Sequence, residues 1–219
     1  MINRYIDLFG VHTIAFLTAD REFIGQDWWQ FLIDHKIRFF IRMRENMQVY
    51  IPAKGITKVF WLFHNLPLNT AYQYPKIVRI NGNWVYLSGL KYVNKKDNIE
   101  YLIVASFTRE CQSLDFYAQR WQIETMFKAF KTAGFNMEDT HLTNYERLDK
   151  MLMIIALAFI WAYKVGILRN DTVKALKIKK HGRLEKSLFA YGLEWLAHAF
   201  INAFQNLMQK LSIAFLSCT

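Results

Sequence analysis

Cysteine, glycine and proline are scarce in this sequence, and each scarcity excludes a class of protein. Two of the 219 residues are cysteine, Cys111 and Cys218, and they lie far apart without a CxxC pair. This usage excludes a zinc ribbon and a disulfide framework, and it is typical of a protein from a reducing cytoplasm. Nine glycines, three prolines and 53% hydrophobic residues exclude collagen-like and disordered chains and leave ample material for a core.

The sequence also lacks a long hydrophobic run and a recognisable targeting segment. No series of basic, apolar and small residues opens the chain, so we expect no signal peptide. The longest apolar run, Met151–Tyr163, has 13 residues between two lysines, whereas about 20 are needed to cross a bilayer. We therefore expect a buried core helix, a cytoplasmic protein and no membrane partner. A basic protein that lies on a membrane surface through this helix is an alternative.

Basic residues are in excess, with 28 Lys and Arg against 18 Asp and Glu and a formal net charge of +10. Such a charge attracts polyanions, and nucleic acid is the first partner to consider. More than half of the excess lies in residues 164–186, where eight basic and two acidic residues give a net charge of +6. This basic segment, which includes Lys179 and Lys180, is either a patch that binds DNA phosphates or a solvated loop.

The first 42 residues read as strand, helix and strand. His12–Leu17 is apolar and partly β-branched, and Ile37–Arg42 is a second short strand. Between them, Gly25–His35 places its tryptophans and other apolar residues at helical spacing. This order is the crossover unit of a parallel sheet and predicts an α/β fold.

From residue 46 the chain changes character. Apolar and polar residues alternate as far as Phe107, and the Asn81-Gly82 pair predicts a hairpin turn, so we expect an antiparallel β insertion with one helix at Lys58–His64. Beyond Phe107 the pattern becomes helical. The expected helices are Ser113–Ala133, Glu146–Leu168, Thr172–Ile178 with Asn170 or Asp171 as its cap, and Ser187–Leu211.

The helix expected over Ser113–Ala133 carries the most informative pattern. At about 100° per residue, four of its residues fall within one stripe roughly 60° wide: Tyr117, Arg120, Glu124 and Lys131. Lys128 lies on the same side of the helix. A carboxylate among cations suits phosphoryl transfer, because the acid can hold a divalent metal and the cations can hold phosphate oxygens. The alternative is a solvated helix with ordinary i,i+4 ion pairs.

A second acid, Asp20, stands where the first predicted strand ends. Open α/β sheets place functional side chains at this position, although a lone Asp there is also a common helix cap or loop residue. Asp20 and Glu124 are two carboxylates on different elements, and together they favour one site.

Three segments of the chain resemble the DDE transposases of the insertion-sequence 4 family. Thr18–Gly25 is similar to the segment around that family's second catalytic Asp, and Gly134–Leu142 is similar to the segment after its signature helix. Four residues reproduce the spacing of its Y-R-E-K signature: Tyr117, Arg120, Glu124 and Lys131. The resemblance runs from about Arg4 to Leu196, nearly the whole chain.

The resemblance implies a ribonuclease-H-like fold with a β-rich insertion between the second Asp and the Glu. It implies that Asp20 and Glu124 are catalytic residues and metal ligands, with Mg²⁺ as the ion or Mn²⁺ in its place. The family cleaves DNA at transposon ends and transfers the strand by two-metal attack of water or a 3′-hydroxyl on a phosphodiester. The implied partner is therefore double-stranded DNA at transposon ends.

Further DNA contacts are implied by the same resemblance. Tyr117, Arg120 and Lys131 would grip the DNA backbone near the scissile phosphate, and Lys128 joins them from helix geometry alone. Family members can also stack an aromatic residue of the insertion on a base swung out of the duplex. Trp84, beside the predicted hairpin turn, is the candidate for that role, and ordinary packing is the alternative.

One departure from the family concerns its first catalytic Asp, which lies on an opening strand well upstream of the second. Only 19 residues precede Asp20, and their one acid, Asp7, lies in a helix-like run. The chain thus looks like the C-terminal portion of a transposase, without the opening strands and inactive by itself. The alternative is a non-catalytic DNA-binding or regulatory remnant that interferes with intact transposase. A homodimer and a mixed oligomer with intact transposase are both open.

These observations predict four segments. A partial ribonuclease-H-like core occupies residues 1–45, and the β-rich insertion occupies residues 46–108. The signature helix and a core helix complete the catalytic domain over residues 109–168, and a basic helical region fills residues 169–219.

Overall fold

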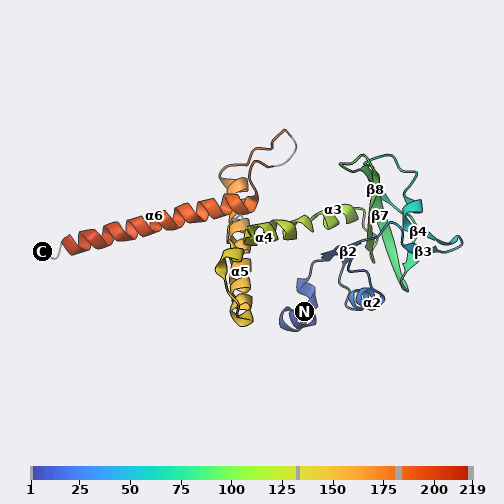
Figure 1. Ribbon diagram of the computed structural model, residues 1–219, viewed down its shortest axis with the longest axis horizontal. Coiled ribbons are helices and arrows are strands. Elements are labelled where there is room, and N and C mark those ends of the chain that lie inside the picture. The colour runs from blue at the N-terminus through green and yellow to red at the C-terminus, as the bar shows by residue number, and fades with distance from the viewer. Residues whose placement is uncertain (1, 132–133, 181–183, 217–219) are drawn as a thin grey trace. The chain divides into compact units, whose positions relative to one another are not determined.

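The computed structural model describes residues 2–131, 134–180 and 184–216, with side chains as far as residue 205. The chain divides into two compact units, unit 1 (residues 1–121) and unit 2 (residues 122–219). Unit 1 holds the sheet and the first three α-helices, and unit 2 is helical (Figure 1). The mixed α/β class predicted from the sequence is confirmed, and it is consistent with a ribonuclease-H-like DDE domain.

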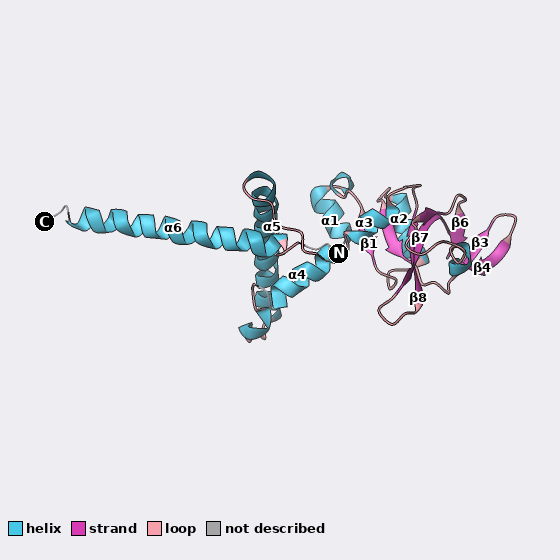
Figure 2. Ribbon diagram, turned by 90° about the horizontal axis from the view of Figure 1, so that it is seen from above, coloured by secondary structure: helices cyan, strands magenta, loops and turns pink. Residues whose placement is uncertain are grey.

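Unit 1 is built on one mixed sheet (Figure 2). The strand order is β1-β2-β8-β7-β6-β3-β4, with β5 paired to β7. The strands are β1 (Leu17–Ala19), β2 (Phe39–Arg42), β3 (Gln48–Ile51), β4 (Gly55–Lys58), β5 (Tyr72–Gln73), β6 (Val78–Ile80), β7 (Asn83–Val93) and β8 (Ile99–Ser106). Strands β1 and β2 are parallel and the other pairs are antiparallel. The helices are α1 (Ile2–Phe9), α2 (Gln26–Asp34) and α3 (Ser113–Ala118).

The predicted crossover unit is confirmed, with β1, α2 and β2 in the expected order. Helix α2 buries Trp29 and Leu32 completely against the sheet core, which is why the chain returns to a parallel neighbour. The first strand lies later than predicted, because the chain at Val11–Thr13 forms a 3₁₀ turn after Gly10, whose φ is +80°. Strand pairing therefore begins only at Leu17.

The antiparallel strands expected after residue 46 are present, and they continue the same sheet because β8 pairs directly with β2. The predicted hairpin joins β6 to β7, with φ of +45° at Asn81 and +82° at Gly82, as a two-residue primed turn requires. The helix expected at Lys58–His64 is instead a short 3₁₀ turn, Val59–Leu62.

The single helix predicted over Ser113–Ala133 is wrong. Helix α3 ends at Ala118, and helix α4 (Trp121–Lys131) starts after a break at Gln119 and Arg120. At the break, the amides of Gln119 and Arg120 donate to carbonyls three residues earlier, and this tighter bonding closes the α3 helix. The stripe calculated for one continuous helix therefore does not carry across Arg120, and the helix end expected at Ala133 lies outside the described residues.

Unit 2 contains α4, a 3₁₀ turn (Met137–Thr140) and two long helices, α5 (Tyr145–Thr172) and α6 (Leu188–Leu216). Asn144 caps α5 by accepting a hydrogen bond from the Arg147 amide. No separate helix forms at Thr172–Ile178, because α5 runs on to Thr172 and the Asn170 side chain accepts from the Leu176 amide beyond it. Helix α6 extends past the predicted end at Leu211.

Helices α5 and α6 cross at two glycines. A Cβ on Gly166 would overlap the Leu188 carbonyl, and one on Gly192 would overlap the Ala162 carbonyl. The glycines thus let the two backbones approach closely. A small buried core surrounds the crossing and α4, with Phe130, Phe159 and Phe189 at its centre.

The expectation that the apolar run in α5 is a buried core helix holds for one face only. Ile155, Phe159, Ala162 and Gly166 are buried, but much of the rest is exposed. By length and composition α5 is the one helix among the described residues that could cross a membrane, with a mean hydropathy of 2.2 in its most apolar window. Soluble proteins also contain such helices, so this is weak evidence of a membrane span.

Candidate active site

Asp20 lies at the carboxyl edge of the two parallel strands of unit 1. The register pairs Ala19 with Ile41, so Asp20 and Arg42 are the next residues along their neighbouring strands. The Arg21 amide donates to Asp20 Oδ1 at 2.9 Å and fixes the carboxylate at the start of the loop. The half-buried Asp20 thus has a basic residue beside it on the next strand.

A cavity of about 570 Å³ opens at this edge. Three arginines line it together with Asp20: Arg21, Arg42 and Arg44. Arg44 Nη2 also binds Glu22 Oε2 at 2.9 Å, and both of these side chains are more than half exposed. Because the guanidinium group presents several donors in one plane, such a group of arginines suits the non-bridging oxygens of phosphates.

Glu100 forms another wall of this cavity, at the start of β8. Its carboxylate accepts hydrogen bonds from Asn94 Nδ2 at 2.5 Å and from the Tyr92 hydroxyl at 2.7 Å. These two bonds, with smaller contributions from Arg42 and Arg21, lower the pKa of Glu100. Burial and the bond to Glu100 raise the pKa of Tyr92. The network therefore holds Glu100 ionised and Tyr92 protonated next to the arginines.

Tyr117 and Arg120, the first two residues of the predicted signature, lie together in unit 1. The Tyr117 ring is buried against Phe40 and Val104 of the sheet, which anchors α3. Arg120 Nε donates to the Tyr117 hydroxyl at 3.2 Å, and the guanidinium lies 5.7 Å from the ring centroid. The buried tyrosine therefore orients the arginine that follows it in the break.

Arg38 strengthens the attachment of α3 to the sheet. It binds Glu110 at 2.9 Å and lies 5.1 Å from the centroid of Phe116, so the loop before α3 and the helix itself are held to β2. Sequence reasoning did not select this pair, because Arg38 and Glu110 are 72 residues apart and only the fold brings them together.

Glu124, Lys128 and Lys131 lie on α4. All three are exposed, and each makes polar or electrostatic contacts in the structure; Lys131 Nζ lies 3.5 Å from Glu138 Oε1. Asp20 belongs to unit 1 and Glu124 to unit 2, so their convergence on one ion stays a prediction. Within the described ranges, no three His, Cys, Asp or Glu side chains gather as metal ligands do.

Trp84 is 43% exposed on β7, beside the hairpin turn. Its ring makes an edge contact with Tyr50 of β3, with the centroids 6.5 Å apart. The neighbouring surface is a shallow hollow of about 260 Å³ that Tyr50, Ile56 and Arg79 help to line. The arrangement combines an accessible aromatic face with a nearby cation, which suits a nucleobase and its phosphate.

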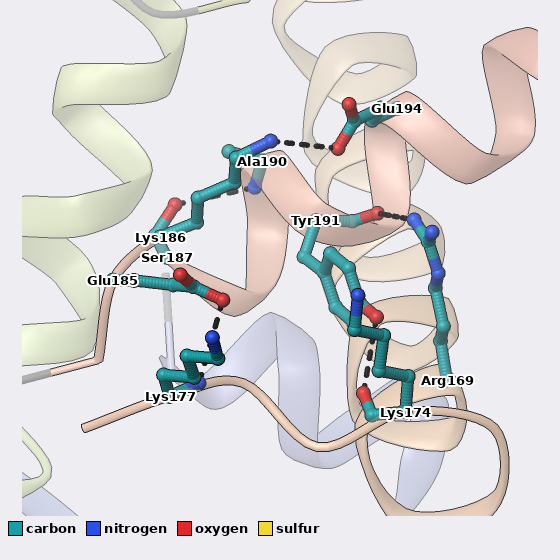
Figure 3. Close-up of polar contacts among 9 residues, drawn as sticks. All are labelled: Arg169, Lys174, Lys177, Glu185, Lys186, Ser187, Ala190, Tyr191 and Glu194. Carbon is teal, nitrogen blue, oxygen red and sulfur yellow. Dashed lines mark hydrogen bonds and ion pairs between the residues drawn. The ribbon is translucent and has the colours of Figure 1, made fainter.

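The basic segment begins in α5 and continues to α6 (Figure 3). Arg169 donates to the Tyr191 carbonyl and lies 4.0 Å from that ring's centroid, and the Tyr191 hydroxyl donates to the Lys174 carbonyl. These contacts tie the start of the segment to α6. Lys186 forms an ion pair with Glu194 at 3.0 Å, so part of the predicted charge is neutralised.

Lys179 and Lys180 are exposed and follow Ile178, which forms an antiparallel bridge with Leu184. The two lysines thus directly follow a residue that is held by backbone pairing. Residues 181–183 of the segment lie outside the described residues.

Sequence reasoning missed the arginines of the cavity, Arg42 and Arg44 above all. The sequence did contain a signal for Arg42. Arg42 is the last residue of the second predicted strand, and Asp20 comes after the end of the first predicted strand. In a parallel pair these positions meet at the same edge, but only the register shows that they are adjacent.

A mixed α/β sheet with an acid at the carboxyl edge of parallel strands, beside arginines, suits a protein that acts on phosphate-containing substrates. Residues 2–161 match the family model described as the transposase DDE domain. The chain therefore belongs to the DDE-domain transposases. A search of curated proteins found no match to this chain.

Proposed function

We propose that this chain supplies catalytic acids and DNA-binding residues of a transposase of the insertion-sequence 4 type. The substrate is double-stranded DNA at transposon ends, and the chemistry is in-line attack of water or a 3′-hydroxyl on a phosphodiester. One observation carries the proposal: Asp20 stands at the carboxyl edge of parallel strands, in a cavity with three arginines, within a transposase DDE domain. We also propose a cytoplasmic location, in keeping with the scarcity of cysteine.

Asp20 and Glu124 are the residues that would hold Mg²⁺, or Mn²⁺ in its place. Their carboxylate oxygens are the ligands these ions prefer, and a magnesium site commonly uses one or two carboxylates with substrate phosphates completing the shell. When bound, the ion supplies an activated nucleophile and neutralises charge on the reacting phosphate.

The cations then hold the DNA strand. Arg42 and Arg44 bind non-bridging oxygens of the phosphate next to Asp20, because both line its cavity. Arg120 contributes a guanidinium that the buried Tyr117 orients, and Lys128 and Lys131 add charge from α4. These groups fix the phosphodiester in place and do not exchange protons with it.

Two further surfaces extend the DNA contact. Trp84 stacks on an unpaired base, supported by the edge contact of Tyr50 and the nearby Arg79. Lys179 and Lys180, which follow the paired Ile178, bind backbone phosphates farther along the duplex.

By itself the chain binds DNA without cutting it. The support is that Asp7, the one acid that precedes Asp20 in this chain, lies on helix α1 and not on a strand. A regulatory protein that occupies transposon ends without cutting them is the second candidate function, favoured by the same observation.

The test mixes the purified chain with labelled duplex from its element's own ends and Mg²⁺. We expect binding without cleavage, and cleavage once a protein carrying the element's upstream coding portion is added. Asp20→Asn and Glu124→Gln should each abolish that cleavage while DNA binding persists. Cleavage by the chain alone would overturn its inactivity, and binding that no upstream portion converts into cleavage would favour the regulatory function.

A further inference from the structure

One face of the sheet of unit 1 carries a row of polar side chains across the neighbouring strands β2, β8 and β7. Side chains an even number of residues apart on a strand share a face, so Glu100 lies on the same face of β8 as Val104, which packs against α3. The register pairs Arg42 of β2 with Val104 and Tyr92 of β7 with Glu100. All three polar side chains therefore project from this face. Arg42 and Glu100 also line the cavity of Asp20.

The turn between β7 and β8 fixes the outer end of this row. Asn94 Oδ1 accepts hydrogen bonds from the amides of Lys96 and Asn98 at 2.8 and 3.0 Å. The Asn94 amide also donates to the Asn98 carbonyl at 2.9 Å. Because the backbone occupies its oxygen, the Asn94 side chain presents Nδ2, which donates to Glu100 Oε1. The turn thus sets the position of one carboxylate oxygen of Glu100.

The other carboxylate oxygen determines which way the Tyr92 hydroxyl points. Glu100 Oε2 accepts the proton of this hydroxyl at 2.7 Å. A phenol has one proton to donate, so the lone pairs of the Tyr92 oxygen are left to accept. Arg42, which has donors only, donates a hydrogen bond to this oxygen, and it opposes the rise in the pKa of Tyr92 that burial and Glu100 cause. Tyr92 is thus an acceptor for Arg42 while Glu100 takes its proton.

A second arginine of unit 1 is held in the same way. Arg120 donates to the Tyr117 hydroxyl at 3.2 Å, and Tyr117 packs on the same face of the sheet. Arg44, in contrast, pairs with Glu22, and both of these side chains are more than half exposed. Exposed ion pairs hold long side chains weakly. Of the two arginines that follow β1 across the cavity, Arg42 is therefore the better restrained.

We propose that three residues of β7, β8 and their turn position the guanidinium of Arg42 for a DNA phosphate: Tyr92, Asn94 and Glu100. A free arginine side chain loses rotamer freedom when it binds a phosphate, and one that is already held loses less. The three residues thus raise the affinity for DNA through Arg42, without contacting the phosphate themselves. This inference rests on the proposed function, because it takes the phosphate next to Asp20 as the ligand of Arg42.

The charge of Glu100 separates positioning from simple electrostatics. A carboxylate next to a bound phosphate repels it, so electrostatics alone predicts that Glu100→Gln strengthens DNA binding. Positioning predicts a loss of about threefold, because the amide of Gln offers one oxygen where Asn94 and Tyr92 use two. Glu22→Gln is the matched control, because it removes one exposed negative charge outside this network. It should not weaken DNA binding.

The main test is a double-mutant cycle, measured by fluorescence anisotropy of the full chain with labelled duplex from its element's ends. Tyr92→Phe keeps the ring and removes the hydroxyl, and it should weaken DNA binding about fivefold, as the loss of one hydrogen bond does. In the Arg42→Ala background the same substitution should change binding less than about 1.5-fold, because the group that Tyr92 positions is gone. Tyr86→Phe, earlier on the same strand, is the control and should leave binding unchanged.

Three outcomes would overturn the positioning role and leave the proposed function standing. They are a Tyr92→Phe variant that binds DNA like wild type, a loss on Tyr92→Phe that is equally large in the Arg42→Ala background, and a Glu100→Gln variant that binds more tightly. If Arg42→Ala itself left DNA binding unchanged, the phosphate contact of the proposed function would be wrong as well. Circular dichroism at the temperature of the binding assay shows that each variant is folded.

Discussion

The two units of this chain are rich in the same apolar residues and bury them to different extents. In unit 1, Trp29, Phe39 and Phe63 are fully buried within one continuous core between the sheet and its helices. In unit 2 the core is a small cluster around Phe130 and Phe159, and much of α5 stays exposed. A sheet covered by helices encloses a core by itself, whereas two crossing helices bury only the sides that meet. Unit 1 should therefore be stable alone, and unit 2 should depend on a partner surface.

The largest effect is expected from a substitution in the core of unit 1. Trp29→Ala should lower the free energy of unfolding of unit 1 by about 3–5 kcal/mol, because it leaves a cavity in the sheet core. Leu168→Ala in unit 2, at a side chain 53% exposed, should cost less than about 1 kcal/mol. Urea unfolding followed by circular dichroism measures both, and equal losses would contradict the contrast between the units.

The second largest effect is expected at the crossing of helices α5 and α6 in unit 2. Gly192→Val forces the backbones apart, because its Cβ would overlap the Ala162 carbonyl, and it should destabilise unit 2 by about 1–3 kcal/mol. Ala199→Val, an exposed position of the same helix, is the control for β-branching alone. Thermal melting of the helical signal compares them, and similar melting temperatures would show that the close approach contributes little.

The third comparison is between basic residues of the two units and their contributions to DNA binding. Arg42→Ala should weaken binding to duplex DNA about tenfold and reduce the slope of log affinity against log salt by about 1, because one phosphate contact is lost. Lys180→Ala should weaken it less, since the exposed lysine is a single point charge on a loop. Fluorescence anisotropy at several salt concentrations measures both. Arg4→Ala, on α1, is the control, because it removes one exposed charge. If it weakened DNA binding as much as Arg42→Ala does, the change in net charge alone would explain the effect.

The smallest effect is expected in the dependence of stability on pH, through Glu100. The pKa of Glu100 lies below its ordinary value of 4.5, so its bonds to Asn94 and Tyr92 add stability above about pH 4.5. That stability is lost as the pH falls through the lowered pKa. Glu100→Gln should therefore make the stability of unit 1 fall less steeply as the pH is lowered. Melting temperatures measured between pH 3 and 7 test this. Glu45→Gln is the control, because Glu45 is an exposed acid on the same cavity. If the melting temperatures of wild type and Glu100→Gln fell equally with pH, the prediction would be rejected.

Local pattern determined most elements of unit 1. The crossover over residues 12–42 and the turn at Asn81 were predictable, because period and turn chemistry are local properties. The break at Gln119 was not, because no Gly or Pro marks it and no local signal announces the three-residue hydrogen bonds that close α3 there. The residues of the predicted signature could be selected by spacing, but their distribution over α3, the break and α4 could not be predicted.

The sequence by itself determined the α/β class, the excess of basic charge and the acid after the first strand, since composition, spacing and order contain them. Only the tertiary structure decided that Arg42 stands beside Asp20, that Tyr117 is buried with Arg120 on its hydroxyl, and that α5 is covered on one side. The reason is physical: strand register and helix crossing depend on contacts between residues far apart in the chain, and no local pattern records them.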